Sequence, residues 1–310
     1  MWIIVALFVG VYSTDGYCRV LALGGGTDKG AYQAGGIIGL VNSLPEGEAQ
    51  WDVVTGVGTG AINGLIVSQF MKGQEAEMSA KLMDFWTNFE TRDFYTDWFG
   101  LFINAYYFKP GFLNTKAMGP TLKNLQSGQF QRFLGVGTTD LITGNYVFFN
   151  TTGQTDDTMS IGILASAADP GMFPFVEYKN FKLVSGAIRE SVEIILGINA
   201  CEEMGFEDSQ VIIDMVMSSG KSVKVVDPSN YNTLQALSRY LDIQAYNSQL
   251  FVISNAKQIF TNVNFRSIIM HSEDMPEPRY PYNYSKKWVK KMISYGETDA
   301  ITAVQAYLSS

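Results

Sequence analysis

Three glycines at alternate positions lie between a run of β-branched residues and a helical pattern. The run covers residues 52–55, the glycines are Gly56, Gly58 and Gly60, and a helix is expected from residue 61. A strand that turns sharply into a helix through glycines is the frame of a nucleophile elbow, whose pattern G-x-S-x-G places a serine on the strained turn. Gly58 stands at the serine position, so the sequence predicts the frame for nucleophilic catalysis without its nucleophile.

A second glycine-rich segment lies nearer the amino terminus. Residues 19–23 form an apolar strand pattern, residues 24–30 are rich in glycine, and residues 31–44 follow a helical pattern. Such a loop can hold a phosphate or an oxyanion with its backbone N–H groups, although any tight turn from strand to helix also favours glycine. A dinucleotide site is disfavoured because Asp52 precedes its strand instead of following it.

The rest of the chain alternates between strand and helix patterns. Strands are expected at residues 133–138, 146–150, 181–184, 211–217 and 249–254, the first two joined as a hairpin. Helices are expected at residues 75–90, 116–125, 160–168, 192–204 and 234–245. This alternation predicts an α/β fold, a three-layer sandwich with a mainly parallel central sheet.

The composition bounds the number of domains and the kinds of partner. A chain of 310 residues that is 46% hydrophobic can bury one large core. We expect a single domain over residues 14–295 and a carboxy-terminal tail over residues 296–310. The formal net charge of -8 disfavours a nucleic-acid partner.

Residues 1–13 are apolar and then meet small residues, which favours a secretory signal peptide over a buried amino-terminal strand. Cleavage after Ser13 would leave Thr14 as the first residue of the mature chain. The remainder has no apolar run of the roughly 20 residues that a transmembrane helix needs, so we expect no transmembrane segment in the mature protein. Glycosylation sequons at Asn150 and Asn283 agree with the secretory pathway, which leads to the extracellular space or an organelle lumen.

Cys18 and Cys201 are the only cysteines in the chain. In a secretory compartment they could form a disulfide, and otherwise they would be two buried thiols. The sequence leaves the pairing open, because it does not give the distance between their Cα atoms.

Two further segments each allow a structural and a functional interpretation. Residues 91–112 are rich in aromatic side chains, which suits a core-covering segment or an apolar cap beside a lipid-sized pocket. A basic amphipathic helix is expected to carry four lysines that form a solvated face or contact an anionic surface. These are Lys286, Lys287, Lys290 and Lys291.

Four stretches together resemble the patatin-like phospholipase family. They are GGGTDKGAYQAG, WDVVTGVGTGAIN, TTDLITGNYVFFN and ASAADPGMFPFVEYKNFKLVSGA. Their order and spacing are more specific than any single motif, and the resemblance extends over about residues 19–227. It implies a lipid acyl hydrolase in which a serine attacks the ester, an aspartate acts as base and the glycine loop holds the oxyanion, with no metal or cofactor.

The positions that would carry this chemistry are substituted. Gly58 stands at the nucleophile position and Ser185 at the base position. The pattern G-x-G-x-x-G covers Gly25, Gly26, Thr27, Asp28, Lys29 and Gly30, with Thr27 in place of its second glycine. If the loop carries one inserted residue, residues 24–26 supply the glycines instead.

Substitute catalytic residues are few. Thr59 has a hydroxyl but lies one residue beyond the apex, Ser166 matches a structural serine, and His271 is the only histidine. We therefore expect a secreted pseudoenzyme of lipid acyl hydrolase ancestry that binds a lipid, a fatty-acyl ligand or a protein partner. The alternatives are an active lipid acyl hydrolase with a displaced nucleophile, Thr59 or Ser185, and a structural protein that reuses only the fold.

Overall fold

The computed structural model describes residues 15–26, 28–99, 106–273, 275 and 284–309. The expected signal peptide and its cleavage point, Thr27 and the sequon residue Asn283 lie outside the described residues.

A single sheet runs through the described part of the chain, in the order β5-β6-β3-β2-β1-β7-β8, with β4 paired to β3. Five neighbouring strands, from β3 to β8, are parallel, whereas β4 and β6 run antiparallel to β3. The strands are β1 (Cys18–Leu23), β2 (Val53–Gly56), β3 (Phe133–Asp140), β4 (Tyr146–Asn150), β5 (Val176–Tyr178), β6 (Phe181–Ser185), β7 (Val211–Gly220) and β8 (Asn264–His271).

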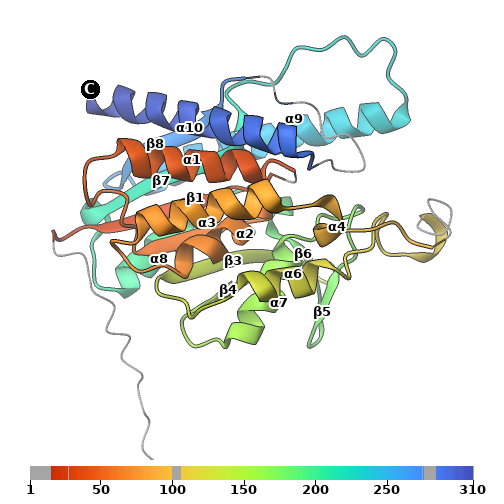
Figure 1. Ribbon diagram of the computed structural model, residues 1–310, viewed down its shortest axis with the longest axis horizontal. Coiled ribbons are helices and arrows are strands. Elements are labelled where there is room, and N and C mark those ends of the chain that lie inside the picture. Colours follow the sequence, from red (N-terminus) through yellow and green to blue (C-terminus); the bar gives the residue numbers. More distant parts are fainter. Residues whose placement is uncertain (1–14, 27, 100–105, 274, 276–283, 310) are drawn as a thin grey trace, which may run out of the picture.

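Helices cover both faces of the sheet (Figure 1). The described helices are α1 (Gly30–Ser43), α2 (Thr59–Ser68), α3 (Glu75–Asn88), α4 (Thr91–Phe94), α6 (Met118–Leu125), α7 (Asp156–Ser166), α8 (Ile194–Glu203), α9 (Thr233–Ile259) and α10 (Lys286–Leu308). Successive side chains of a strand point to opposite faces, so Leu21 and Leu23 join the core under α1, α2 and α10, while Val20 and Ala22 join the core under α8. The fold is the mixed α/β sandwich that the sequence predicted.

Helices α1 and α10 approach each other closely through small residues. A Cβ on Gly35 would lie 2.0 Å from the carbonyl oxygen of Ile293, and one on Gly296 would lie 2.1 Å from that of Tyr32. The carboxy-terminal tail expected over residues 296–310 is therefore wrong. This segment continues α10 to Leu308, and Ala300 and Val304 are buried in the core.

The strand expected at residues 249–254 is wrong, because this segment lies inside α9 and the late strand is β8. Gln249, Ile253 and Ala256 form the buried side of the helix, at the spacing of four and three residues that one helix face requires. The β-branched content of a short apolar run does not distinguish a strand from a helix of this kind.

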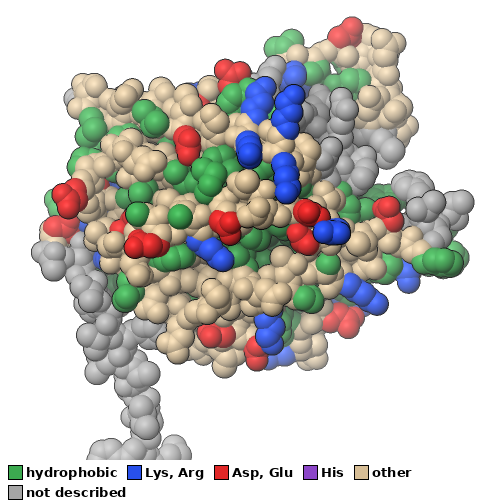
Figure 2. Space-filling view, viewed as in Figure 1, with side chains coloured by type: hydrophobic (Ala, Val, Ile, Leu, Met, Phe, Trp, Pro, Cys, Tyr) green, Lys and Arg blue, Asp and Glu red, His purple; other side chains and the backbone are tan. Residues whose placement is uncertain are grey.

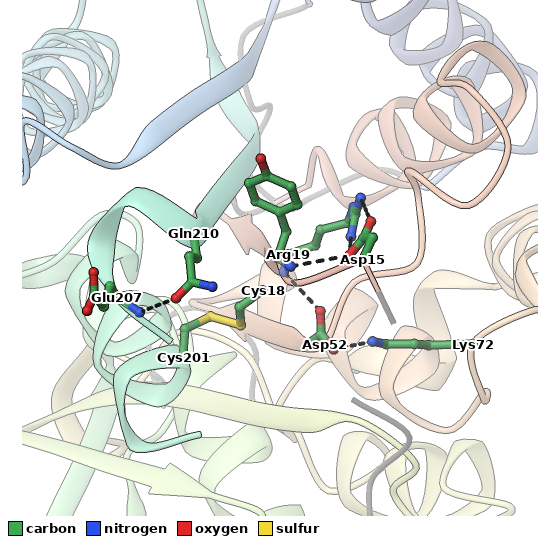
Figure 3. Close-up of a disulfide and its surroundings, with 9 residues drawn as sticks. Asp15, Cys18, Arg19, Asp52, Lys72, Cys201, Glu207 and Gln210 are labelled. Atoms are coloured by element: carbon green, nitrogen blue, oxygen red, sulfur yellow. Dashed lines mark hydrogen bonds and ion pairs between the residues drawn. A yellow bond between two sulfur atoms is a disulfide. The ribbon is translucent and has the colours of Figure 1, made fainter. Parts of the chain in front are cut away.

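A disulfide joins β1 to α8 on the second face of the sheet (Figure 3). The Cα atoms of Cys18 and Cys201 are 5.9 Å apart, and 183 residues separate them in the sequence. Both cysteines are fully buried in the core that α8 covers.

Buried charged groups at the amino ends of the parallel strands are paired. Arg266 donates to both carboxylate oxygens of Asp214, at 2.9 and 2.5 Å, and also reaches Glu48. Trp51 Nε1 donates to Asp214 at 2.8 Å, and Arg19 donates to Glu48 at 2.8 Å.

The surface gives less specific information about function. Lysine side chains gather over the start of α10 (Figure 2), where the four lysines noted in the sequence are exposed. Within the part of the chain that the structure describes, no helix combines the length and the apolar character that a bilayer span needs.

Candidate functional site

The turn between β2 and α2 has the geometry of a nucleophile elbow. Gly58 caps α2 with φ 60° and ψ -127°, a conformation that strains any residue with a Cβ. A Cβ on Gly56 would lie 2.4 Å from the carbonyl oxygen of Gly60, and one on Gly60 would lie 2.5 Å from that of Leu23. The flanking glycines are therefore needed because the strand and the helix pass so close to each other.

Ser166 stabilises the elbow turn through two hydrogen bonds. The backbone N–H of Gly58 donates to Ser166 Oγ at 3.0 Å, and Ser166 Oγ donates to the carbonyl oxygen of Gly137 at 2.7 Å. The hydroxyl is fully buried and has both its donor and its acceptor role filled. This geometry assigns Ser166 a structural role in the turn.

Positions 58 and 185 face each other, although they lie far apart in the sequence. A Cβ on Gly58 would lie 3.8 Å from Ser185 Oγ. Ser185 ends β6, which pairs with β3 so that Ser185 lies opposite Thr138, and its hydroxyl accepts from the backbone N–H of Ala187 at 3.3 Å. The fold thus brings together the nucleophile and base positions that the family resemblance assigned.

The glycine loop also lies beside the position that a Cβ on Gly58 would occupy. The same Cβ on Gly58 would lie 3.3 Å from Gly25 Cα and 3.7 Å from the backbone nitrogen of Gly26. Gly24 and Gly25 donate their N–H groups to the carbonyl oxygens of Val216 and Ser191, whereas the described part of the chain shows no acceptor for the N–H of Gly26. Gly25 and Gly26 belong to both alignments of the family pattern, so their position beside the elbow is compatible with either one.

The remaining loop residues connect the site to the core. A Cβ on Gly30 would lie 2.3 Å from the Trp86 ring, so the α1 amino end packs directly on that ring. Asn63 donates to the carbonyl oxygen of Gly30 and accepts from Trp86 Nε1. Asp28 is buried, and Lys29 donates its backbone N–H to the carbonyl oxygen of Gly26.

Three buried hydroxyls beside the loop have no hydrogen-bond partner among the described residues: Thr59 Oγ1, Ser191 Oγ and Ser218 Oγ. Ser218 Oγ lies against Gly26, since a Cβ on that glycine would be 1.9 Å from it. Thr59 and Ser218 are only 4% and 2% exposed. Buried hydroxyls are normally hydrogen-bonded. Four further buried hydroxyls lack a partner among the described residues and do not belong to this loop: Ser79, Thr87, Thr139 and Ser267.

Glu193 is a buried carboxyl group near the site that the sequence reasoning missed. Tyr146 donates its hydroxyl to Glu193, and a Cβ on Gly186 would lie 2.7 Å from that same hydroxyl oxygen. Burial raises the pKa of Glu193 to about 8. The sequence does contain a signal for this buried carboxyl group, because Glu193 is a single acidic residue within the apolar run around residues 192–196.

The other sequence candidates lie apart from this arrangement. The ring of His271, on β8, packs edge-on against Tyr32, and its Nδ1 lies 2.9 Å from the carbonyl oxygen of Glu273. Asn150, at the end of β4, is partly exposed and accepts from the backbone N–H of Thr152.

The fold and the elbow together define an α/β protein built on a hydrolase frame. The family model for patatin-like phospholipase matches residues 21–196, more than half of the chain, and the chain belongs to this family. Among solved structures, VipD from Legionella pneumophila is similar, with a TM-score of 0.43 and 11% sequence identity over 94% of this chain and 67% of that chain. A comparison with curated protein sequences gives no match.

Proposed function

We propose that this protein is a secreted pseudo-phospholipase that keeps the site of its lipid acyl hydrolase ancestors for binding a lipid or protein partner. The observation that carries the proposal is the 3.8 Å distance between a Cβ on Gly58 and Ser185 Oγ. A covalent mechanism needs a nucleophile at the first position and a base at the second. Gly58 has no side chain, and a serine hydroxyl does not accept a proton near neutral pH.

The retained frame supports binding as the surviving role. Gly56, Gly60 and Ser166 keep the geometry of the elbow turn, and Gly25 still lies against the nucleophile position. Gly58 adopts the positive φ of this turn without strain, so the frame is preserved although the reactive side chain is missing.

Secretion is supported by two features. The apolar residues 1–13 have the pattern of a signal peptide. The disulfide between Cys18 and Cys201 suits an oxidising compartment.

One observation favours a second candidate, an active hydrolase that uses Thr59. Its buried Oγ1 has no hydrogen-bond partner in the described part of the chain, so the hydroxyl is not committed to the fold. Replacing it by the isosteric valine would abolish any turnover that depends on it, and a pseudoenzyme has no turnover to lose.

Turnover and lipid content test the proposal together. Purified wild-type protein should hydrolyse neither p-nitrophenyl esters nor phospholipids above the buffer rate, and mass spectrometry should find lipid that co-purifies with it. Wild-type turnover that Thr59→Val removes would establish the second candidate instead. Absence of both turnover and lipid would leave only the protein-partner form of the proposal.

A further inference from the structure

The point that a serine side chain would occupy at position 58 lies close to two hydrogen-bond donors, and the Gly25 Cα lies 3.3 Å from it. The same point lies 3.7 Å from the nitrogen of Gly26 and 3.8 Å from Ser185 Oγ. The N–H groups of Gly26 and Thr59 have no acceptor in the described part of the chain. Because Ser185 Oγ accepts from Ala187, its own proton is available to a further acceptor. An oxygen placed slightly nearer these groups than the Cβ point would reach hydrogen-bond distance, about 2.7–3.2 Å.

The same point is favourable for negative charge. Helix α2 begins there, and its first turn contains no acidic residue to offset the partial positive charge of its amino end. The aspartate that the family resemblance implies at position 185 would repel an anion, but Ser185 is neutral. Glu193, which accepts from the Tyr146 hydroxyl beside Gly186, stays largely protonated at neutral pH, because burial raises its pKa to about 8.

The unpartnered hydroxyls provide an independent indication of a polar ligand. Thr59 follows Gly58 directly, and Ser218 Oγ lies against Gly26 from the β7 side. Both are more than nine-tenths buried, and leaving such a group without a hydrogen bond costs free energy. A ligand that accepts hydrogen bonds at the loop would use these groups.

The hydrophobic core begins immediately beside the loop. Trp86 packs on Gly30, and its ring continues into a cluster of aromatic rings with centroid separations of 5.1–6.3 Å. The cluster contains Trp86, Phe89, Phe94, Phe173 and Tyr284. Because the proposed function is lipid binding, we favour a ligand with a charged head and a hydrocarbon tail over an inorganic anion.

We propose that the loop at Gly25 and Gly26, the amino end of α2 and Ser185 bind the carboxylate of a fatty acid. This inference rests on the proposed function and names its ligand. The two substitutions that remove the catalytic pair also convert the catalytic site into an anion-binding site. Gly58 leaves room for the ligand oxygen, and Ser185 replaces a negative charge by a hydroxyl donor.

The experiment measures equilibrium binding of decanoate, with decanol as the neutral ligand of equal chain length and acetate as the head group alone. Wild-type protein should bind decanoate at least about tenfold more tightly than decanol or acetate. Ser185→Asp should weaken decanoate binding at least about tenfold, because like charges about 4 Å apart repel strongly inside a protein. Ser185→Asn is the matched control of equal size without charge, and it should weaken decanoate binding much less than Ser185→Asp does.

Gly58→Ala provides a second test, because its methyl group would stand at the position assigned to the ligand oxygen. It should also weaken decanoate binding, and a melting curve must show that each variant is folded. Equal binding of decanoate and decanol, or equal effects of Asp and Asn at position 185, would overturn the carboxylate site while leaving lipid binding intact. Equal binding of acetate and decanoate would overturn the fatty-acid assignment. Hydrolysis of p-nitrophenyl decanoate by the wild type would overturn the proposed function itself.

Discussion

At the amino ends of the parallel strands, buried charged groups are paired with one another, whereas at the carboxyl ends several buried hydroxyls have no partner in the described chain. Arg266 and Asp214 form a two-bonded ion pair that Trp51 completes. At the other end, the hydroxyls of Thr59 and Ser218 are equally buried and have no partner in the described chain. Unpaired buried groups reduce stability, so the hydroxyls beside the loop fit the binding role that we propose for the carboxyl end. The amino end has one such group, Ser267, which lies opposite Asp214 in the sheet.

The largest expected effect comes from restoring the catalytic pair at the carboxyl end. Gly58→Ser with Ser185→Asp should raise hydrolysis of short-chain p-nitrophenyl esters at least about 10²-fold over wild type, because nucleophile and base act as a unit. Gly58→Ser alone should recover little. Steady-state rates check this.

The matched control is Gly58→Ala with Ser185→Asp, which has the same strained turn and the same base but no nucleophile. Its rate should equal that of the wild type. If wild-type protein already hydrolyses the ester as fast as the restored variant, the nucleophile lies elsewhere and the functional contrast between the two ends fails.

Breaking the ion pair at the amino end should have the largest effect on stability. Arg266→Ala leaves Asp214 as an uncompensated buried charge, which costs about 3–5 kcal/mol. Denaturant unfolding measures the loss. Lys287→Ala, an exposed change on α10, should stay within about 0.5 kcal/mol of wild type. A similar small loss for Arg266→Ala would show that the amino end is not the stabilising one.

The disulfide should contribute somewhat less. Replacing Cys18 and Cys201 by serine should lower the free energy of unfolding by about 2–4 kcal/mol, because the bridge constrains a long loop in the unfolded chain. Reduction of the wild type should produce the same loss and should not affect the double variant. Two thiols that react with maleimide in denatured, unreduced protein would show that the bridge does not form.

The last expected effect is a pH dependence of stability that originates near the carboxyl end and is spread over several pH units. The pKa of Glu193 is raised by burial to about 8, so the folded state binds this proton more tightly than the unfolded state. Its contribution to stability is therefore present at low pH and is lost as pH rises from about 5 to 8, by at most about 1.4 kcal/mol per pH unit. Glu193→Gln keeps a hydrogen-bond partner for Tyr146 and should flatten that slope. An unchanged slope would mean that Glu193 titrates normally.

The sequence alone determined the frame of the molecule, because short-range sterics leave few choices. Gly56, Gly58 and Gly60 predicted a turn in which strand and helix pass so close to each other that only glycine fits. Alternating patterns located most strands and helices to within a few residues. The substituted residues at positions 58 and 185 could also be read directly from the motif order.

Tertiary packing decided everything that depends on residues distant in the sequence. The approach of Ser185 to Gly58 follows from the antiparallel pairing of β6 with β3, which no local pattern expresses. The helical state of residues 249–254 follows from the face that α9 buries, and the cysteine pairing from the position of α8 on β1. These features depend on which surfaces meet, and only the folded chain brings those surfaces together.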